Sequence, residues 1–252
     1  MIHPTAIIHP SVQLDASISV GAFVVIEQNV VVGKNTILKT GTVLRSGSRV
    51  GENCQLGPYA VVGGEPMDSS FKGEESFAVL ENFVTMREFA TVHRATGEHA
   101  ETRVGENTLV MCYVHVSHNV QVGKNCTLTN NVQLAGHCQV GDYAVLGAAV
   151  MFHQFCRVGG YTIIAATSAS YQDILPFSMA YGNPAQHYRL NKVGLQRRGI
   201  TGERYKILEK AIRAFRRKEW DLLNEFATQS EDVKEMLLFK EASKRGICSF
   251  VG

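Results

Sequence analysis

The stretch VHVSHNVQVGKNCTLTNNVQLAGHCQVGDYAVLG, residues 114–147, decides the fold because it places an aliphatic residue at every sixth position. These residues are Val116, Val122, Leu128, Leu134, Val140 and Leu146. The same step of six holds from Ile2 to Ile164, and only Asp68, Glu74 and Glu98 fall on it without being apolar. A helix would repeat at about 3.6 residues and a strand at about 2. A sustained six-residue period instead predicts a parallel β-helix.

Each hexapeptide is predicted to form a short strand followed by a turn. Glycine often follows the repeat aliphatic, as at Gly21, Gly57 and Gly105, where it suits a tight corner. Three hexapeptides close one triangular coil of eighteen residues, and successive coils pair through their backbones at about 4.8 Å. About nine coils fit between Ile2 and Ile164. Their stacking buries a continuous apolar prism that no single repeat could form.

The three polar positions mark two excursions from the prism, after which the period returns in the same phase. Val62 is followed in register by Leu80, and Val92 by Val104. We therefore expect polar loops at residues 63–79 and 93–103. Loops that project from a rigid scaffold often carry binding residues, although tolerated surface insertions would give the same pattern.

The chain is predicted to change its structure after residue 170, where the period stops. Residues 173–186 contain Pro176, Gly182 and Pro184 and are expected to form an irregular crossing loop. Helix signals follow, because Thr201 precedes one amphipathic run and Ser230 a second, which ends near residue 246. The sequence thus predicts a mainly β domain at residues 1–185 and a small α-helical domain at residues 186–252. The helical domain is expected to pack against the prism or a neighbouring subunit.

Composition narrows the class of protein. The formal net charge of +2 gives no support for nucleic-acid binding, and no apolar run reaches the roughly 20 residues of a transmembrane segment. The first residues already belong to the repeat, so we expect no cleaved signal peptide. The six cysteines have no C-x-x-C spacing. We interpret most of them as small core residues of a reduced, cytoplasmic protein.

Histidines form the most informative polar pattern. Because eighteen residues make one coil, His118, His137 and His153 fall within one residue of the same place on three successive coils. They should therefore line one edge of the prism within about 10 Å. His93 and His115 lie in the same part of the chain.

A row of histidines has three interpretations. A zinc site would need ligands that converge at about 2.0 to 2.1 Å from the metal, whereas residues along an edge diverge, so we expect no metal. Unconnected surface histidines are the second interpretation. A catalytic groove is the third and is favoured, because imidazole supplies a general base near neutral pH and donors for a charged or hydroxylated substrate.

The repeat, the histidines and the tail together resemble one known family. The strings that carry the resemblance are, in chain order, REFATVHRAT, VHVSHNVQVG, NNVQLAGHCQVGD, MFHQFCRVG, YGNPA and NKVGLQRRG. They resemble the acyl-carrier-protein:UDP-N-acetylglucosamine O-acyltransferases of lipid A biosynthesis over essentially the whole chain. The resemblance implies a left-handed parallel β-helix, a homotrimer, and active sites in clefts between neighbouring subunits.

The resemblance also implies a reaction and roles for particular residues. An (R)-3-hydroxyacyl chain would pass from the phosphopantetheine of acyl carrier protein to the 3-hydroxyl of UDP-N-acetylglucosamine, the first step of lipid A biosynthesis, without a resident cofactor. His118 matches the general base, and the Gly136 N–H matches the donor to the oxyanion. Substrate contacts are implied for Asp68, Lys72, His93, His115, His137, His153, Gln154, Asn191, Arg197 and Arg198, the last four in the nucleotide-binding region. Ala166 matches the position that limits acyl-chain length.

Three positions depart from the family pattern. Asn119 follows the expected base where an aspartate is common, so it can orient the imidazole but cannot stabilise an imidazolium by charge. Ser70 stands where lysine is frequent, although Lys72 lies close by, and Val193 stands where an acidic nucleotide contact can occur. These changes leave open an acceptor with a 3-amino group, whose product would be an amide.

Two other functions stay open at this point. One is another acyltransferase or acetyl-CoA-dependent acetyltransferase on the same hexapeptide prism, against which the helical tail and the GLQRRG string argue. The other is a binding scaffold without catalysis, against which the presence of His118 argues.

Overall fold

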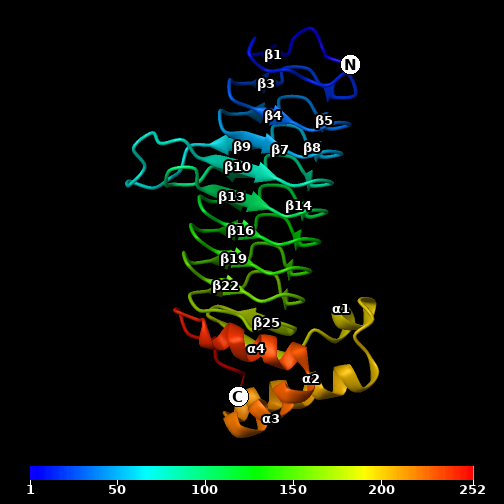
Figure 1. Ribbon diagram of the computed structural model, residues 1–252, viewed down its shortest axis with the longest axis vertical. Coiled ribbons are helices and arrows are strands. Elements are labelled where there is room, and N and C mark those ends of the chain that lie inside the picture. The colour runs from blue at the N-terminus through cyan, green and yellow to red at the C-terminus, as the bar shows by residue number, and fades with distance from the viewer. Residues whose placement is uncertain (252) are drawn as a thin grey trace.

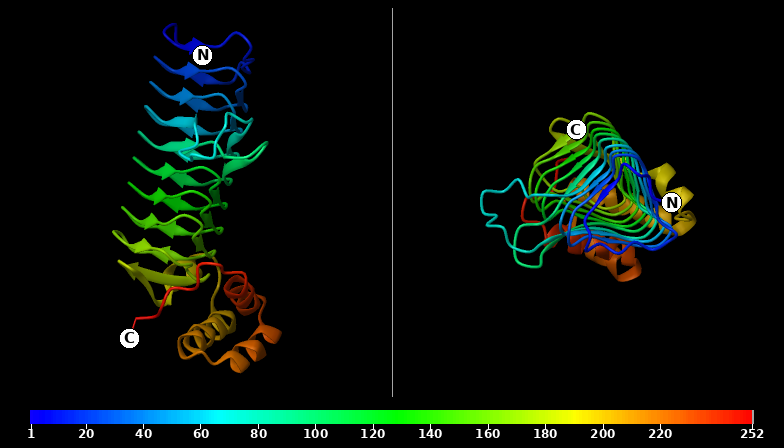
Figure 2. Two further views of the ribbon diagram at one scale, coloured as in Figure 1. Left: turned by 90° about the vertical axis from the view of Figure 1, so that its left-hand side faces the viewer. Right: turned by 90° about the horizontal axis from the view of Figure 1, so that it is seen from above.

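The computed structural model describes residues 1–251, most of which form a long triangular prism of parallel strands (Figure 1, Figure 2). Each face of the prism is one sheet, with nine, seven and ten strands in the described residues. We call these faces the nine-stranded, seven-stranded and ten-stranded walls, and the chain visits them in that order. Helices close the C-terminal end of the prism.

The nine-stranded wall contains β1 (Ile7–Ile8), β3 (Val25–Ile26), β6 (Val43–Leu44), β9 (Val61–Gly64), β12 (Thr91–His93), β15 (His115–Val116), β18 (Gln133–Leu134), β21 (Met151–Phe152) and β24 (Ala169–Ser170). The seven-stranded wall contains β4 (Val31–Val32), β7 (Ser48–Val50), β10 (Phe77–Leu80), β13 (Glu101–Val104), β16 (Gln121–Val122), β19 (Gln139–Val140) and β22 (Arg157–Val158). The ten-stranded wall contains β2 (Ser19–Val20), β5 (Ile37–Leu38), β8 (Gln55–Leu56), β11 (Thr85–Met86), β14 (Leu109–Val110), β17 (Thr127–Leu128), β20 (Val145–Leu146), β23 (Ile163–Ile164), β25 (Ser178–Gly182) and β26 (Ala185–Leu190).

The walls are built by pairing strands that lie one coil apart. Gln121 pairs with Gln139, and Gln139 with Arg157, in each case eighteen residues along the chain. The second residue of each of these strands points into the prism, so Val122 and Val140 are buried. The predicted parallel β-helix and its six-residue period are therefore confirmed.

Both polar loops leave the prism at one corner, between the nine-stranded and seven-stranded walls, which we call the loop corner. The first loop, residues 65–76, joins β9 to β10, and the second, residues 94–100, joins β12 to β13. In the view along the prism, the first of them projects well beyond the stacked coils (Figure 2). Both are shorter than the predicted ranges, because the ends of those ranges pair as strands: Gly64 with His93, and Phe77 with Glu101.

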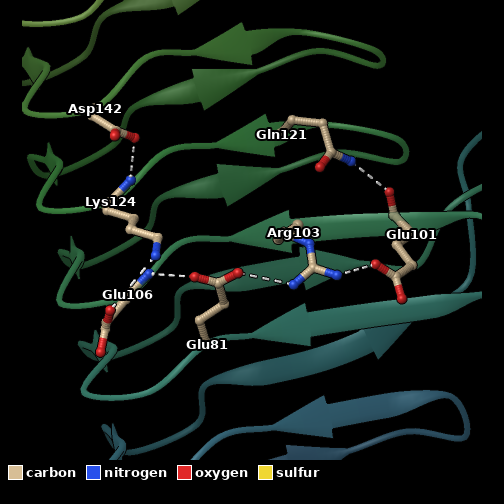
Figure 3. A network of polar contacts seen from close by, with 7 residues as sticks. All are labelled: Glu81, Glu101, Arg103, Glu106, Gln121, Lys124 and Asp142. Atoms are coloured by element: carbon tan, nitrogen blue, oxygen red, sulfur yellow. Dashed lines mark hydrogen bonds and ion pairs between the residues drawn. The ribbon is translucent and has the colours of Figure 1, made fainter.

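The seven-stranded wall carries a chain of polar contacts on its outer face (Figure 3). Arg103 lies between Glu81 and Glu101 and binds both carboxylates. Glu81 also accepts a hydrogen bond from the Glu106 backbone N–H, and the Lys124 ammonium lies 3.8 Å from the Glu106 carboxylate. Exposed ion pairs contribute only about 0–1 kcal/mol each. The network therefore connects neighbouring coils, while the apolar interior supplies most of the stability.

The C-terminal end of the prism differs from the prediction. Residues 173–186, expected to be irregular, contain β25 and the start of β26, which pair as an antiparallel hairpin. Strand β25 also pairs in parallel with β23, so the sheet continues to Leu190. The expectation of an irregular loop was wrong because Gly182 and Pro184 mark the tight turn of a hairpin rather than an unpaired segment.

Four helices follow within the described residues: α1 (Lys192–Arg197), α2 (Gly202–Arg217), α3 (Trp220–Gln229) and α4 (Glu231–Glu241). Thr201 and Ser230 are the N-caps of α2 and α4, as predicted, whereas α3 was not predicted and α4 ends five residues before residue 246. The helices share a second apolar core with Leu175 and Phe177. Over residues 1–251, no helix combines the length and the apolar character needed to cross a bilayer.

A buried histidine connects the hairpin to the C-terminal segment and makes the fold sensitive to acid. The Leu175 N–H donates to His187 Nε2 at 2.9 Å, and His187 Nδ1 donates to the Cys248 carbonyl at 3.0 Å, so the ring is neutral. Burial lowers the pKa of His187 to about 4. The unfolded chain binds this proton near pH 6.5, so the free energy of unfolding should fall between pH 6.5 and pH 4, by on the order of 3 kcal/mol for this group.

Denaturant titrations of the wild type and of His187→Gln at several pH values measure this contribution. Glutamine offers a donor and an acceptor but does not titrate. The variant should therefore lose less stability than the wild type between pH 6.5 and pH 4. Equal losses in the two proteins would contradict the prediction.

Candidate active site

His118 is the centre of a polar cluster at the loop corner. It lies in the turn between β15 and β16, and only 7% of its surface is exposed. Its ring meets the ring of His137, from the next coil, edge to face with centroids 5.2 Å apart. The predicted alignment of these two histidines on successive coils is confirmed.

The hydrogen bonds of Asn119 determine which nitrogen of His118 carries the proton. Asn119 Oδ1 accepts from the Thr96 N–H at 3.0 Å, and Asn119 Nδ2 donates to the Thr96 carbonyl at 2.9 Å. This pair of bonds fixes the orientation of the amide, because a flipped amide would face donor to donor and acceptor to acceptor. Asn119 Oδ1 also lies 2.9 Å from His118 Nδ1. Nδ1 must therefore donate, which leaves Nε2 of the neutral ring as a free base.

Gly136 provides the space for the His118 ring. A Cβ atom at position 136 would lie 2.4 Å from both Cε1 and Nε2 of His118, so the basic edge of the ring rests on the glycine backbone. The Gly136 carbonyl accepts from the Phe155 N–H, but the Gly136 N–H donates to no acceptor within residues 1–251. A free base and a free N–H donor thus lie side by side.

Asp68 brings the first loop to the same histidine. Its Oδ1 accepts from the Ser70 N–H at 2.8 Å, and its Oδ2 lies 3.8 Å from His118 Nδ1. The bonds from Ser70, with smaller contributions from His118 and His137, lower the pKa of Asp68 below its usual value. Asp68 is therefore a carboxylate at neutral pH.

His93 and His115 form a second histidine pair on the outer side of β12 and β15. Their rings meet edge to face with centroids 4.9 Å apart. His93 Nδ1 donates to the Glu65 carbonyl, and His115 Nδ1 bonds to the Thr91 hydroxyl. Burial lowers the pKa of His93, and burial together with the two neighbouring histidines lowers the pKa of His115 to about 4. Both rings are therefore neutral at pH 7 and can act as polar contacts without adding positive charge.

The part of the site that lies on the C-terminal side of His118 is aromatic and basic. His137 stacks on Phe155 with centroids 4.7 Å apart, and burial lowers the pKa of His137. His153, one coil further along, contacts Arg245 and Tyr171 instead of His137. A groove of about 600 Å³ adjoins His137, and every charged side chain that lines it is basic. Those side chains are Arg157, Lys244 and Arg245, which suits a ligand that carries phosphate.

The polar cluster contains three groups that could in principle bind a metal ion. The ligand atoms of Asp68, His118 and His137 lie within 4.8 Å of one another. Ligands on a tetrahedral zinc ion lie about 3.3 Å apart, given bonds of about 2.0 to 2.1 Å. His118 Nδ1 is also committed to Asn119. The arrangement therefore fits a hydrogen-bonded base better than a preformed metal site.

One chain does not bring all the expected site residues together. Lys72 and Gln154 are exposed at the loop corner. Ala166 is exposed at a different corner, between the ten-stranded and nine-stranded walls. Asn191 is the N-cap of α1, where it accepts from Gly194 N–H and donates to the Tyr161 carbonyl. Arg197 and Arg198 follow it and are exposed, with the Arg198 guanidinium 4.5 Å from the ring centre of Tyr143.

Three residues of the site were not predicted from the sequence. Thr96 acts through its backbone, and Arg245 comes from the segment after α4, so neither falls on the eighteen-residue register. Phe155 could have been found, because it follows His137 by one coil and shares its left-handed turn position, with φ of 66° against 62°.

The arrangement suits general-base catalysis of the addition of a nucleophile to a carbonyl group. His118 Nε2 can remove a proton from a nucleophile, and the Gly136 N–H can donate to an oxyanion at the same place. The basic side chains of the neighbouring groove can bind a phosphorylated substrate.

Comparison with known proteins places this site in the hexapeptide class of transferases. The bacterial transferase hexapeptide model matches residues 29–64 and 101–136. A second model, described as domain 2 of UDP-N-acetylglucosamine O-acyltransferase, matches residues 173–248. The prism and the helical tail are thus matched separately.

The solved structures identify the family within this class. The UDP-N-acetylglucosamine acyltransferase of Francisella novicida superposes with a TM-score of 0.95 at 33% identity, covering 99% of this chain and 94% of that one. The enzyme of Campylobacter jejuni gives 0.91 at 34% identity, covering 100% of each chain. The chain belongs to the UDP-N-acetylglucosamine acyltransferase family, and its prism is a left-handed parallel β-helix.

Curated sequences agree with this assignment. The acyl-[acyl-carrier-protein]–UDP-N-acetylglucosamine O-acyltransferase of Fusobacterium nucleatum is 52% identical over 161 residues, which are 62% of this chain and 63% of that protein. The chain spans about three fifths of the length of the curated relatives that it matches.

Proposed function

We propose that the chain transfers an (R)-3-hydroxyacyl group from acyl carrier protein to the 3-hydroxyl of UDP-N-acetylglucosamine, the first step of lipid A biosynthesis. The observation that carries the proposal is the His118 ring, whose free Nε2 lies against Gly136, and the N–H of that glycine has no acceptor within residues 1–251. Family membership supports the substrate classes, since a relative is named for O-acyl transfer between acyl carrier protein and UDP-N-acetylglucosamine.

The proposed chemistry needs no covalent enzyme intermediate. His118 Nε2 accepts the proton of the sugar hydroxyl while the oxygen adds to the thioester carbonyl, and the Gly136 N–H donates to the resulting oxyanion. The carbonyl then re-forms, the C–S bond breaks, and the imidazolium returns its proton to the departing thiolate. The products are the O-acylated sugar nucleotide and the free thiol of the carrier. The acyl donor brings its own phosphopantetheine, so no resident cofactor takes part.

We infer a homotrimer in which neighbouring subunits complete the site. The loop corner of one chain provides Asp68, His93, His115, His118 and His137, whereas Ala166 lies at another corner of the prism and Arg197 and Arg198 lie at the end of α1. A second copy would bring those residues to the cleft, with the two arginines on the diphosphate. Sedimentation analysis measures the subunit number. We further infer a cytoplasmic location, which the six free thiols support.

Direct assay tests the proposed reaction. The protein is incubated with UDP-N-acetylglucosamine or its 3-amino analogue and with a series of (R)-3-hydroxyacyl carrier proteins or acetyl-CoA, and the product is identified by mass spectrometry. An ester formed on the 3-hydroxyl from a hydroxyacyl donor is the expected result. Preferred amide formation would reassign the acceptor, and transfer from acetyl-CoA alone would contradict the proposal.

Ala166 is expected to limit the length of the acyl chain. Its methyl group is exposed at the corner that a neighbouring subunit would present to the cleft. Ala166→Gly should move the preference towards longer donors. The ratio of kcat/KM for the longer donor to kcat/KM for the shorter one should rise by roughly 10- to 200-fold for each added methylene. The kcat/KM values for a donor series measure the shift, and an unchanged preference would contradict this role for Ala166.

A further inference from the structure

We propose that Asp68, on the first loop, is the counter-ion of the His118 imidazolium in this chain, and that Asn119 is a positioning residue that ties the second loop to the ring. The inference rests on the proposed function and assigns separate residues to the two tasks that an aspartate after the base would combine. The neutral amide of Asn119 orients the imidazole, and the carboxylate of Asp68 on the first loop supplies the negative charge.

Asn119 is suited to orientation and unsuited to carrying charge. Its amide uses both of its ends on the Thr96 backbone, one as acceptor and one as donor. A carboxylate at position 119 would place an oxygen against the Thr96 carbonyl, where Asn119 Nδ2 now donates at 2.9 Å. The left-handed backbone of Asn119, with φ of 60°, is held by its N–H bond to the Thr102 hydroxyl. The second loop is therefore anchored to the residue that orients the base.

Asp68 is suited to the complementary task. Its Oδ1 is committed to the Ser70 N–H, which turns Oδ2 towards His118 Nδ1 at 3.8 Å. Within residues 1–251, Asp68 is the only carboxylate that lies within 4 Å of the His118 ring nitrogens. An opposite charge at this distance stabilises the protonated ring. The position thus supplies the negative charge that Asn119 lacks.

The other titratable groups around His118 do not offer an alternative counter-ion. His137 faces it from the next coil, His93 from the preceding coil, and His115 from the strand just before it on the same coil. Each of these rings can only add positive charge, and each has its pKa lowered by burial. When His118 is protonated, Asp68 alone among these groups balances the charge.

The pH dependence of kcat/KM separates the two roles. Asp68→Asn should move the acidic limb of the profile to lower pH, because the imidazolium loses its counter-ion. Asp68→Glu should restore part of the shift. Asn119→Ala should lower kcat about 10- to 100-fold with little change in KM, because the ring loses its orientation. Glu75→Gln changes another carboxylate of the same loop, which faces His99, and is the matched control.

A measurement without turnover keeps this test independent of the proposed reaction. With histidine labelled at its ring nitrogens, NMR reports the pKa and the tautomer of His118 in the free protein. The His118 pKa should fall in Asp68→Asn and stay unchanged in Glu75→Gln, and the Nδ1–H tautomer should lose its dominance in Asn119→Ala. An unmoved pKa in Asp68→Asn would overturn the counter-ion role, even if KM rises through a lost sugar contact. An unchanged tautomer in Asn119→Ala would overturn the positioning role. Failure of the wild type to transfer any acyl group would instead reject the proposed function.

Discussion

Replacing His118 by alanine is expected to lower kcat by about 10²- to 10⁴-fold, the usual contribution of a positioned general base. Only 7% of the surface of His118 is exposed, and its Nδ1 is committed to Asn119, so Nε2 is the one nitrogen free to take a proton. Initial rates of hydroxyacyl transfer at saturating sugar nucleotide measure the loss.

Two comparisons make this result specific. His9→Gln, which changes an exposed histidine of the first coil, should leave kcat unchanged. The circular dichroism and the sedimentation of His118→Ala should match those of the wild type, since the residue lies in a turn outside the apolar interior. Wild-type turnover by a folded His118→Ala protein would exclude His118 as the base.

Gly136→Ala is expected to reduce kcat by about 10²-fold or more. The added methyl group would lie 2.4 Å from two atoms of the His118 ring, so the ring must turn away. Displacement of a catalytic group by about 1 Å is enough for a loss of this size. Gly136 is outside the left-handed φ region, so alanine introduces the contact without backbone strain.

A double-mutant cycle distinguishes displacement of the ring from damage to the backbone. If Gly136→Ala acts through His118, then adding it to His118→Ala should cost little more activity. Independent losses that multiply would indicate that the Gly136 N–H itself has been moved. A fully active Gly136→Ala protein would contradict the observed contact between the ring and the glycine.

The sequence predicted the parts of the site that follow the coil register. His118 and His137 could be paired because each occupies the same turn on successive coils, and coil spacing then brings the rings together. Thr96 could not be predicted, because it acts through its backbone from a loop that interrupts the register. His153 kept its place in the register, but a side chain from the helical tail, Arg245, determines its contact.

The hairpin at the end of the prism shows a second limit of sequence patterns. Gly182 and Pro184 occur in tight turns and in irregular segments alike, so the residue types alone do not separate them. The neighbouring strands determine that residues 178–182 form a strand, because β25 pairs with β23 on one side and with β26 on the other. The departure of this chain from the family pattern at Asn119 is likewise explained only by the folded structure. There Asn119, held by the Thr96 backbone, orients His118, and Asp68 supplies the negative charge.

The order of the walls also restricts which changes in chain length this protein can tolerate. Deleting one hexapeptide from the uninterrupted coils ahead of His137 would move every later residue back to the preceding wall, so that His137 would leave the loop corner. Deleting eighteen residues would preserve each wall and shorten the prism by one coil. The two loops escape this restriction, because Val62 still pairs with Val92 after thirty residues and Val92 with Val116 after twenty-four. Natural length variation is therefore expected at these loops or in whole coils.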